Sequence, residues 1–430
     1  MNKKIELLAP AGSLEKLKWA INWGADAVYL GGNKYSLRAN AKNFSIEEIK
    51  EGVLYAHNHN AKVYVAVNIV FHNEDLNGIN EYLKELEKIK VDAIIFSDPL
   101  VMDIVNNNIN LELHYSTQGS TFNSDAALYL KKNNVKRVVL ARECSKSDIK
   151  SIIDKTGLEV ECFVHGAMCV NISGRCVLSN YFTNRDANRG GCAQVCRFNF
   201  NLYDKDKNIV SDGNNFSIAP KDLCLMDNLK DMIDIGVSSL KLEGRMRSIY
   251  YVSTILSVYR RLIDMYLSKN IDTDYVTKAS IILNRCANRE VKAQFFNTKP
   301  NHNDQYYKGR KEESNQDFLG IVLDYNELKK EAVIEQRNFF KTGDKVTIFS
   351  PSGKDYSFNV GYIKDIDDNI LDAARHPREI IKINCEKRVN KNDLMRVNFL
   401  DWQYIKNMII CYAHTNYFEV SLWQKQKKYI

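Results

Sequence analysis

Short apolar runs alternate with amphipathic stretches through the first 245 residues of the chain. The runs are almost uninterrupted, which is typical of parallel strands buried on both faces. We therefore expect strands over Ile5–Leu8, Ala27–Leu30, Lys62–Asn68, Ala93–Phe96, Glu112–Ser116, Arg137–Leu140, Leu158–Val164 and Ser239–Leu242. This succession of strand–helix units favours an α/β fold built as a (β/α)8 TIM-like barrel, with a doubly wound parallel sheet as the alternative.

The stretches between these runs carry helix start signals. Ser45 and Glu48 have the spacing of a capping box, in which each side chain satisfies a backbone N–H of the other residue. Ser145 and Asp148 repeat the device before the helix that follows the sixth run. Beyond the last run, Ser248–Leu267 predicts one long helix, and a further helical stretch completes the barrel domain.

The pattern changes near residue 297, which divides the chain into domains. Residues 1–296 form the predicted barrel domain, with a long insertion over 165–238 after the seventh strand. Residues 297–317 lose all periodicity and read as a linker. Residues 318–398 alternate strand-like runs with tight turns, so we expect a small antiparallel β-barrel there. Residues 399–430 form an aromatic and basic tail.

Composition narrows the class of protein. Hydrophobic residues make up 45% and charged residues 26%, which is typical of a soluble globular protein. The formal charge of +7 permits a nucleic-acid partner without requiring one. The start of the chain lacks the apolar core of a secretory signal, and no run has the length of a membrane span. We therefore expect a cytoplasmic protein that does not enter a membrane.

Four of the ten cysteines lie close together inside the insertion, at Cys169, Cys176, Cys192 and Cys196. In a reducing cytoplasm, grouped cysteines bind metal more often than they form disulfides. A tetrahedral zinc ion and an iron–sulfur cluster are the two candidates. Cys192 and Cys196 have the short spacing of structural zinc sites, but Cys169 and Cys176 are farther apart, which favours a cluster over zinc. The insertion begins at the C-terminal end of the seventh strand, and active sites of such barrels are built at the C-terminal ends of the strands.

Polar side chains at the predicted strand ends are candidates for a substrate pocket. They are Asn68, Gln118, Arg142, His165, Glu243 and Arg245. Structural roles are the alternative, since Arg142 with Glu143, and Glu243 with Arg245, can form ion pairs that close the barrel mouth. A lone histidine such as His165 is more often a hydrogen-bonded structural residue than a ligand.

Four arginines are interleaved with the grouped cysteines: Arg175, Arg185, Arg189 and Arg197. Their charge can balance that of thiolates, or bind an anionic substrate or an RNA phosphate. The sequence contains none of the common hydrolase or nucleotide-binding motifs, and it identifies no catalytic residue.

Six segments together resemble the bacterial collagenase-like peptidase family of unknown catalytic type. They are ELLAPAG at 6–12, GADAVYLGG at 24–32, VHGAMC at 164–169, SGRC at 173–176, NRGGCAQVCR at 188–197 and KLEGRM at 241–246. The resemblance spans about residues 5–296, and the segment from Phe318 resembles the C-terminal domain of the family. The chain is most similar to the long members, which take part in 5-hydroxyuridine synthesis on tRNA.

This resemblance implies a function. It implies oxygen-independent hydroxylation of the wobble uridine in the tRNA anticodon region, with prephenate, a small anionic metabolite, as the hydroxyl donor. It implies a 4Fe–4S cluster on the four grouped cysteines, with Cys224 as a reserve ligand in place of Cys196. A paralogous partner subunit is a further expectation. The alternatives are a peptidase, hydroxylation of ribosomal RNA or a quinone precursor, and a non-catalytic redox partner of a paralogue.

Overall fold

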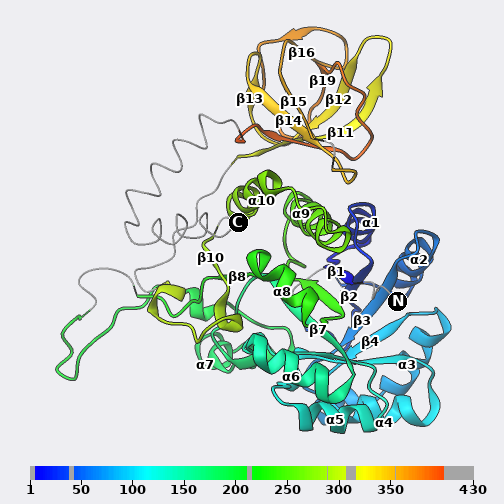
Figure 1. The fold of residues 1–430 in the computed structure, drawn as a ribbon, viewed down its shortest axis with the longest axis vertical. Coiled ribbons are helices and arrows are strands. Elements are labelled where there is room, and N and C mark those ends of the chain that lie inside the picture. Colours follow the sequence, from blue (N-terminus) through cyan, green and yellow to red (C-terminus); the bar gives the residue numbers. More distant parts are fainter. Residues whose placement is uncertain are drawn as a thin grey trace. The chain divides into compact units, whose positions relative to one another are not determined.

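The computed structural model describes residues 5–37, 43–210, 216–287, 289–306, 316–353 and 355–400. The chain divides into two compact units, residues 1–314 and residues 315–430. The first carries the parallel strands and the grouped cysteines, and the second is built from antiparallel strands (Figure 1).

The first unit is a closed parallel barrel. Its strands are β1 (Glu6–Pro10), β2 (Ala27–Gly31), β3 (Lys62–Val67), β4 (Ala93–Phe96), β5 (Glu112–Tyr115), β6 (Arg137–Val139), β7 (Glu159–Gly166) and β9 (Ser239–Leu242). Strands β1 to β7 pair in chain order, and β9 pairs in parallel with both β7 and β1, which closes the sheet. The predicted (β/α)8 barrel is confirmed, and the doubly wound alternative is wrong because an open sheet would leave β1 and β7 unjoined.

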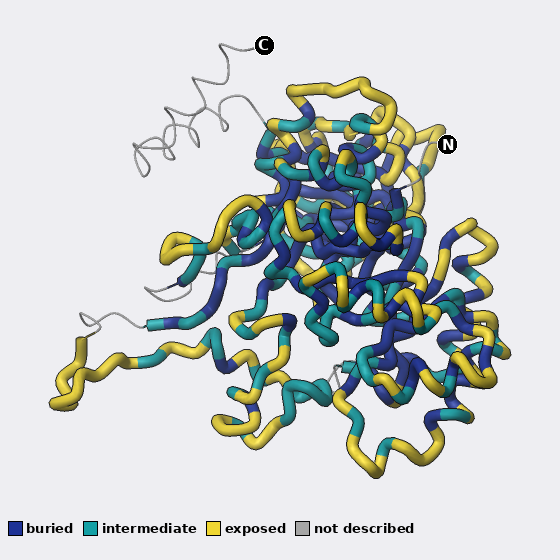
Figure 2. The backbone as a smooth tube through the Cα atoms, turned by 60° about the horizontal axis from the view of Figure 1, so that its bottom comes forward, coloured by how far each residue is buried: buried dark blue, intermediate teal, exposed yellow. Residues whose placement is uncertain are grey.

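Helices follow the strands and cover the barrel. They are α1 (Leu14–Asn22), α2 (Ile46–Asn58), α3 (Ile79–Lys88), α4 (Pro99–Asn108), α5 (Ser124–Lys132), α6 (Lys146–Thr156), α8 (Leu229–Asp234), α9 (Ile249–Ser268) and α10 (Thr273–Ala287). Both predicted capping boxes form, at the starts of α2 and α6, and the predicted long helix is α9, capped by Ser248. Figure 2 shows the barrel strands buried at the centre of this unit.

A network of ion pairs fills part of the barrel interior. The Arg137 guanidinium lies 2.5 Å from Glu6 and 3.2 Å from Glu161, and Lys241 Nζ lies 2.7 Å from Glu161. The Tyr64 hydroxyl donates to Glu6 at 2.6 Å. Burial alone would raise the pKa of Glu161, but the charges of Lys241 and Arg137 hold that pKa below its ordinary value. Glu161 therefore stays ionised inside the barrel.

The insertion after β7 contains little regular structure. It holds the short 3-10 turns η3 (Ile172–Gly174), η4 (Ala187–Arg189) and η5 (Val195–Arg197), the helix α7 (Leu178–Thr183) and the strand β8 (Asp222–Cys224). Strand β8 pairs antiparallel with the end of β7 and parallel with β10 (Val291–Lys292). Residues 201–210 form an exposed arm (Figure 2).

The second unit is an antiparallel half-barrel. Its strands are β11 (Phe318–Asn326), β12 (Glu331–Gln336), β13 (Phe340–Lys341), β14 (Lys345–Phe349), β15 (Tyr356–Asn359), β16 (Ile363–Lys364), β17 (Ile370–Leu371), β18 (Ala373–Ala374), β19 (Ile380–Asn384) and β20 (Leu394–Val397). Eight of them form one sheet in the order β15-β14-β20-β11-β12-β19-β16-β17, and β13 pairs with β18. The predicted small antiparallel domain is therefore present, as a half-barrel.

The segment predicted as a linker begins on the first unit. Tyr306 is 4% exposed, and its hydroxyl accepts a hydrogen bond from Glu290 N at 2.7 Å. These contacts fix this end of the segment to the first unit. Residues 307–315 and most of the predicted tail, 401–430, lie outside the described residues.

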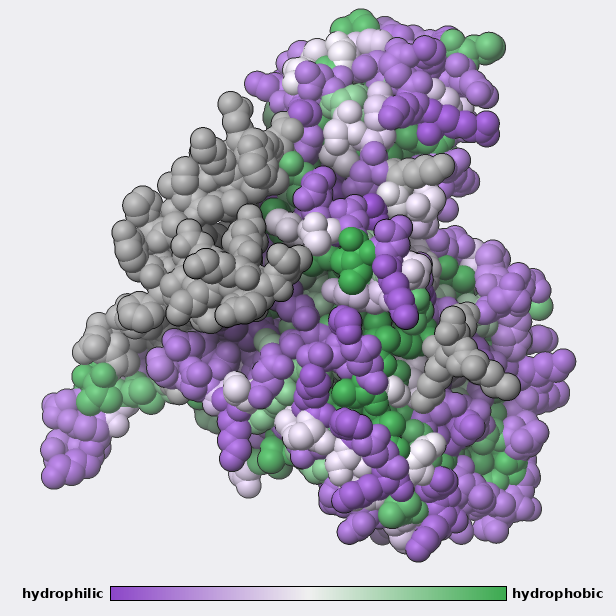
Figure 3. Space-filling model, viewed as in Figure 1, coloured by the Kyte–Doolittle hydropathy of each residue, from purple (hydrophilic) through white to green (hydrophobic). Residues whose placement is uncertain are grey.

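No helix in the described part of the chain is long and apolar enough to cross a membrane. The face of the molecule drawn in Figure 3 is mostly hydrophilic.

Candidate cysteine centre at the mouth of the barrel

The four grouped cysteines lie on the turns of the insertion. Cys169 follows β7, Cys176 precedes α7, and Cys192 and Cys196 lie before and within η5. Cys192 is exposed, the other three are partly buried, and all four are free thiols. Residues from a single segment therefore present four potential sulfur ligands where β7 leaves the barrel.

Backbone N–H groups point at three of these sulfur atoms. Cys176 Sγ accepts from Leu178 N at 3.3 Å, and Cys192 Sγ accepts from Gln194 N at 3.4 Å. The N–H of Asn171 acts in the same way on Cys169, where it lowers the thiol pKa against the larger raising effect of burial. Each donor lies two residues after its cysteine. Such N–H donors favour a negatively charged sulfur and tune the potentials of iron–sulfur clusters.

The four thiols also lie within electrostatic reach of one another. Burial raises the pKa of Cys196 to about 11, Arg197 opposes the shift, and the other three grouped thiols add to it. Cys176 and Cys192 likewise contribute to the raised pKa of Cys169. The reserve ligand Cys224 lies beside Tyr259 and Asp227; burial raises its pKa to about 11, Asp227 adds to the shift, and the hydrogen bond with Tyr259 opposes it.

The donor set can be compared with the two metal centres that the sequence suggested. In the described part of the chain, no three His, Cys, Asp or Glu side chains are placed to hold a single metal ion. Zinc bonds to sulfur at about 2.3 Å, so four ligands of one zinc lie about 3.8 Å apart. A cluster is several atoms across and holds its cysteine sulfurs farther apart. Four neighbouring thiols with backbone N–H donors fit the chemistry of a cluster.

Loops after β5 and β6 contact the cysteine segment, which is the part of the insertion from Cys169 to Cys196. A Cβ atom at Gly174 would lie 3.4 Å from Gln118 Nε2, so the two residues are in contact. The Arg142 guanidinium stacks over the Phe163 ring at 3.8 Å, and its charge lowers the pKa of Cys169 against the effect of burial. Gln118 and Arg142, two of the predicted pocket residues, are therefore beside the cysteine centre.

Three buried polar atoms of this region have no hydrogen-bond partner within the described structure. They are Glu143 Oε2, Asn171 Nδ2 and Ser173 Oγ. Glu143 uses its other oxygen to accept from Ser173 N at 3.1 Å, and does so in place of the predicted ion pair with Arg142. Ser173 is 1% exposed and has φ of +54°, a conformation that favours glycine. Buried polar groups are normally satisfied, so these atoms mark a place for water or a ligand.

Sequence reasoning missed Asn171 and Ser173, and it noted Glu143 at a strand end without including it among the candidate pocket residues. The one available signal was the Ser173-Gly174 dipeptide, which indicates a turn. Nothing in the spacing shows that this turn buries its side chains under the cysteine segment.

Arg245 ties the mouth of the barrel together. Its guanidinium donates to the carbonyl oxygens of Leu37 and Gly31 at 3.2 and 3.3 Å, and to Asn43 Oδ1 at 2.5 Å. A Cβ atom at Gly31 would lie 2.6 Å from Arg245 Nη2, so only glycine leaves room for this side chain. These three oxygens belong to the end of β2 and the loop after it, so Arg245 makes a structural contact at the mouth.

The other pocket candidates lie at neighbouring strand ends. Asn68 donates to Ser116 Oγ at 3.3 Å, which joins the ends of β3 and β5. His165 is 1% exposed, and burial followed by the charge of Arg247 lowers its pKa to about 3, so the ring is neutral. The backbone N–H of Glu243 donates to the His165 carbonyl at 2.9 Å, which joins β9 to β7.

The interleaved arginines divide into two pairs. Arg175 and Arg185 are exposed. Arg189 pairs with Asp75 and donates to the Val70 carbonyl at 2.9 Å, which fixes the insertion to the loop after β3. Arg197 is directed to Asp222 on β8.

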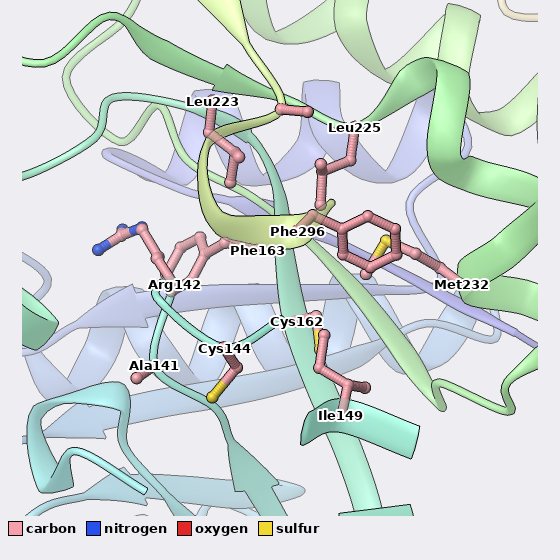
Figure 4. Close-up of a pocket in the computed structure, with 11 residues that line it drawn as sticks. Ala141, Arg142, Cys144, Ile149, Cys162, Phe163, Leu223, Leu225, Met232 and Phe296 are labelled. Atoms are coloured by element: carbon pink, nitrogen blue, oxygen red, sulfur yellow. The ribbon is translucent and has the colours of Figure 1, made fainter. Parts of the chain in front are cut away.

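A small cavity is lined by residues of β7, β8 and the loop after β6 (Figure 4). Its volume is about 20 Å³, which is enough for a single water molecule. Cys144, Cys162 and Phe163 are among its lining residues. Burial raises the pKa of Cys144 to about 12 and that of Cys162 well above its usual value, so both thiols are protonated. The cavity therefore belongs to the packed core.

Comparison with known proteins finds two family matches that cover most of the chain. Residues 12–306 match peptidase family U32, and residues 314–396 match the peptidase family U32 C-terminal domain.

Three relatives carry different names. The tRNA hydroxylation protein P1 of Bacillus subtilis (strain 168) is 45% identical over 404 residues, which cover 92% of this chain and 95% of that protein. The 23S rRNA 5-hydroxycytidine C2501 synthase of Escherichia coli (strain K12) is 37% identical over 63% of this chain and 41% of that protein. A collagenase of Porphyromonas gingivalis (strain ATCC BAA-308 / W83) is 35% identical over 63% of this chain and 68% of that protein.

Proposed function

The chain belongs to peptidase family U32, and from this premise we propose that it is a tRNA-modifying enzyme that hydroxylates C5 of the wobble uridine. One observation carries the proposal: the similarity to the tRNA hydroxylation protein P1 extends over 95% of that protein. The match is too long to reflect the barrel alone. The proposal includes an iron–sulfur centre on the four grouped cysteines, with prephenate as the hydroxyl donor and no requirement for molecular oxygen.

The surroundings of the cysteines support a metal centre over a peptidase nucleophile. A cysteine peptidase needs a thiol that a neighbouring base activates. Burial has the largest effect on the pKa of Cys169 and Cys196, and the other contributions come from arginines, neighbouring thiols and, for Cys169, the Asn171 N–H. His165, the histidine nearest in sequence to Cys169, is buried and neutral with a pKa of about 3. We therefore favour hydroxylation over the activity that the collagenase relative is named for.

Residues around the four cysteines have different proposed roles in binding the cluster and the substrate. Once bound to the four sulfurs, an iron–sulfur cluster supplies electron transfer or a coordination position for a hydroxyl donor. Arg142, beside Cys169, offsets the negative charge of thiolate ligands. Glu143, Asn171 and Ser173 each offer an unsatisfied polar atom to a substrate at the barrel mouth.

The proposed RNA substrate suits this site. An anticodon-loop uridine leaves its stack at little cost, so its C5 atom can enter a pocket that a duplex base cannot reach. The positive formal charge of +7 favours contact with phosphates and predicts binding that weakens as salt rises.

Hydroxylation of ribosomal RNA is the second candidate. The ribosomal RNA synthase of Escherichia coli is similar to this chain, but the match covers only 41% of that protein. The tRNA assignment therefore has the stronger support.

Nucleoside mass spectrometry tests the two candidates together. In a bacterial strain that lacks every family member, this chain is supplied alone, and tRNA and 23S rRNA are digested separately. We expect 5-hydroxyuridine or nucleosides derived from it to return in tRNA, and 5-hydroxycytidine to stay absent from 23S rRNA. Cys176→Ala should abolish the tRNA product, whereas Cys385→Ala, in the second unit, should leave it unchanged. Absence of the tRNA product with the wild-type chain would contradict the assignment.

A further inference from the structure

Three arginines converge on one buried aspartate beside the cysteine centre. Asp222, on β8, is 1% exposed. Its carboxylate oxygens lie 3.6 Å from Arg197 Nη2, 3.7 Å from Arg247 Nη2 and 3.6 Å from Arg289 Nη1. Three guanidinium groups thus share this one carboxylate. Like charges held together away from water repel one another, so this arrangement is costly as it stands.

The contacts within this arginine cluster are also incomplete. All three distances exceed the usual hydrogen-bond range. Both Asp222 oxygens lack a hydrogen-bond partner within the described structure, and so does Arg197 Nη1. The Arg197 side chain is 7% exposed, so bulk water has little access to its guanidinium group. A buried, charged donor without an acceptor calls for an ion or ligand that supplies one.

The cluster adjoins the grouped cysteines and the start of α9. Arg197 directly follows Cys196, and its charge lowers the Cys196 pKa against the larger effect of burial. Arg247 directly precedes Ser248, the N-cap of α9, and it stacks over the Tyr251 ring at 4.9 Å. With 27% of its side chain exposed, Arg247 leaves the cluster open to solvent on one side.

We propose that Arg197, Arg247 and Arg289 bind the carboxylate of a small organic acid next to the cysteine centre. This inference rests on the proposed function and identifies a site for its small co-substrate. Arginine presents a planar fork that matches a carboxylate with two parallel hydrogen bonds. The Arg197 and Arg289 side chains are 7% and 10% exposed, which admits a small molecule more readily than the phosphate of an RNA backbone. Asp222 holds the arginines in place when the acid is absent.

Isothermal titration calorimetry on the full chain, purified without oxygen, tests the proposal with prephenate and malonate as probes. Arg197→Gln and Arg289→Gln should each weaken binding of the acid by about tenfold or more, since each removes a charge-assisted contact. Arg388→Gln is the matched control because that side chain is 72% exposed in the second unit, and its binding should equal that of wild type. An RNA hairpin with the anticodon-loop sequence, titrated in parallel, should bind all variants within about threefold of wild type.

Asp222→Asn separates a binding site from a structural ion cluster. Removing the aspartate charge removes the carboxylate that the three arginines share, so malonate should raise the melting temperature of this variant more than that of wild type. No binding of either acid to wild type, or equal binding to wild type and both arginine variants, would overturn the proposal. Loss of hairpin binding with retained acid binding would assign the cluster to RNA phosphate instead. Neither result bears on the nucleoside measurement, which tests the tRNA function by itself.

Discussion

Two buried groups of charges in the barrel unit differ in how well they are satisfied. In the barrel interior, Arg137 and Lys241 reach Glu6 and Glu161 at 2.5 to 3.2 Å. At the rim of the barrel, beside the grouped cysteines, three arginines lie 3.6 to 3.7 Å from Asp222. Both Asp222 oxygens and Arg197 Nη1 lack a hydrogen-bond partner in the described structure. The ion pairs of Glu6 and Glu161 therefore lie near hydrogen-bonding distance, whereas those of Asp222 are longer.

This difference separates scaffold from site. Buried charges are tolerated when paired and hydrogen-bonded, and they are costly otherwise. Four residues in or beside the insertion, Glu143, Asn171, Ser173 and Arg197, each have one buried polar atom without a hydrogen-bond partner in the described structure. A ligand at the rim would complete contacts that the protein leaves open, and we expect substitutions there to change binding more than folding.

The largest expected effect comes from breaking the interior network. Lys241→Met leaves Glu161, which is 0% exposed, without its closest cation, and should lower the free energy of unfolding by about 3–5 kcal/mol. Lys150→Met is the control, because Lys150 forms an exposed pair with Asp154 and should change stability by less than about 0.5 kcal/mol. Urea denaturation of both variants measures the difference. Equal midpoints would show that the interior network is not structural.

His165, at the border between the two regions, should make stability depend on pH. Its pKa is about 3 in the folded chain because of burial and Arg247, against about 6.5 unfolded. The unfolded chain therefore takes up a proton first as pH falls, and stability is lost between about pH 6.5 and 3. From pH 6.5 to 5 this loss is about 2 kcal/mol.

Melting temperatures across this pH range test the prediction. His165→Gln should flatten the dependence, whereas His376→Gln, at an exposed position of the second unit, should leave it as in wild type. An unchanged slope in His165→Gln would mean that the imidazole is not held neutral.

The smallest effect is expected at Ser173, and its sign is informative. Glycine removes both the cost of φ at +54° and the unsatisfied hydroxyl, so Ser173→Gly should leave the free energy of unfolding unchanged or raise it by up to about 1 kcal/mol. Ser253→Gly, at a buried position within α9, should lower it by about 1 kcal/mol. Calorimetric melting of the Ser173→Gly and Ser253→Gly variants measures both changes. A loss at Ser173 as large as at Ser253 would indicate a structural role for the hydroxyl.

The sequence predicted the barrel well, because continuous apolar runs specify strands buried on both faces. Ala93–Phe96 and Ser239–Leu242 have the bounds that the pattern indicated, and the others differ by a few residues at their ends. Strands β8 and β10 were missed, since runs of three and two residues carry no period. The second unit was predicted as a barrel, but whether a sheet closes depends on pairings between distant strands.

Parts of the site could not be predicted for the same reason. The grouped cysteines stand out because residue type and spacing lie in one segment. The arginine cluster joins Arg197, Arg247 and Arg289 to Asp222, and only folding brings these segments together. Arg245 was predicted as a pocket residue, and its contacts with backbone carbonyls depend on the fold around the end of β2, which the sequence does not show.

Iron and acid-labile sulfide in the chain purified without oxygen test the central claim most directly. A cluster on the four grouped cysteines predicts about four of each per chain. Both should be lost in alanine variants of Cys169, Cys176, Cys192 and Cys196, and retained in Cys224→Ala. One zinc ion per chain with no iron, or iron that survives loss of Cys176 and Cys192 together, would contradict the account.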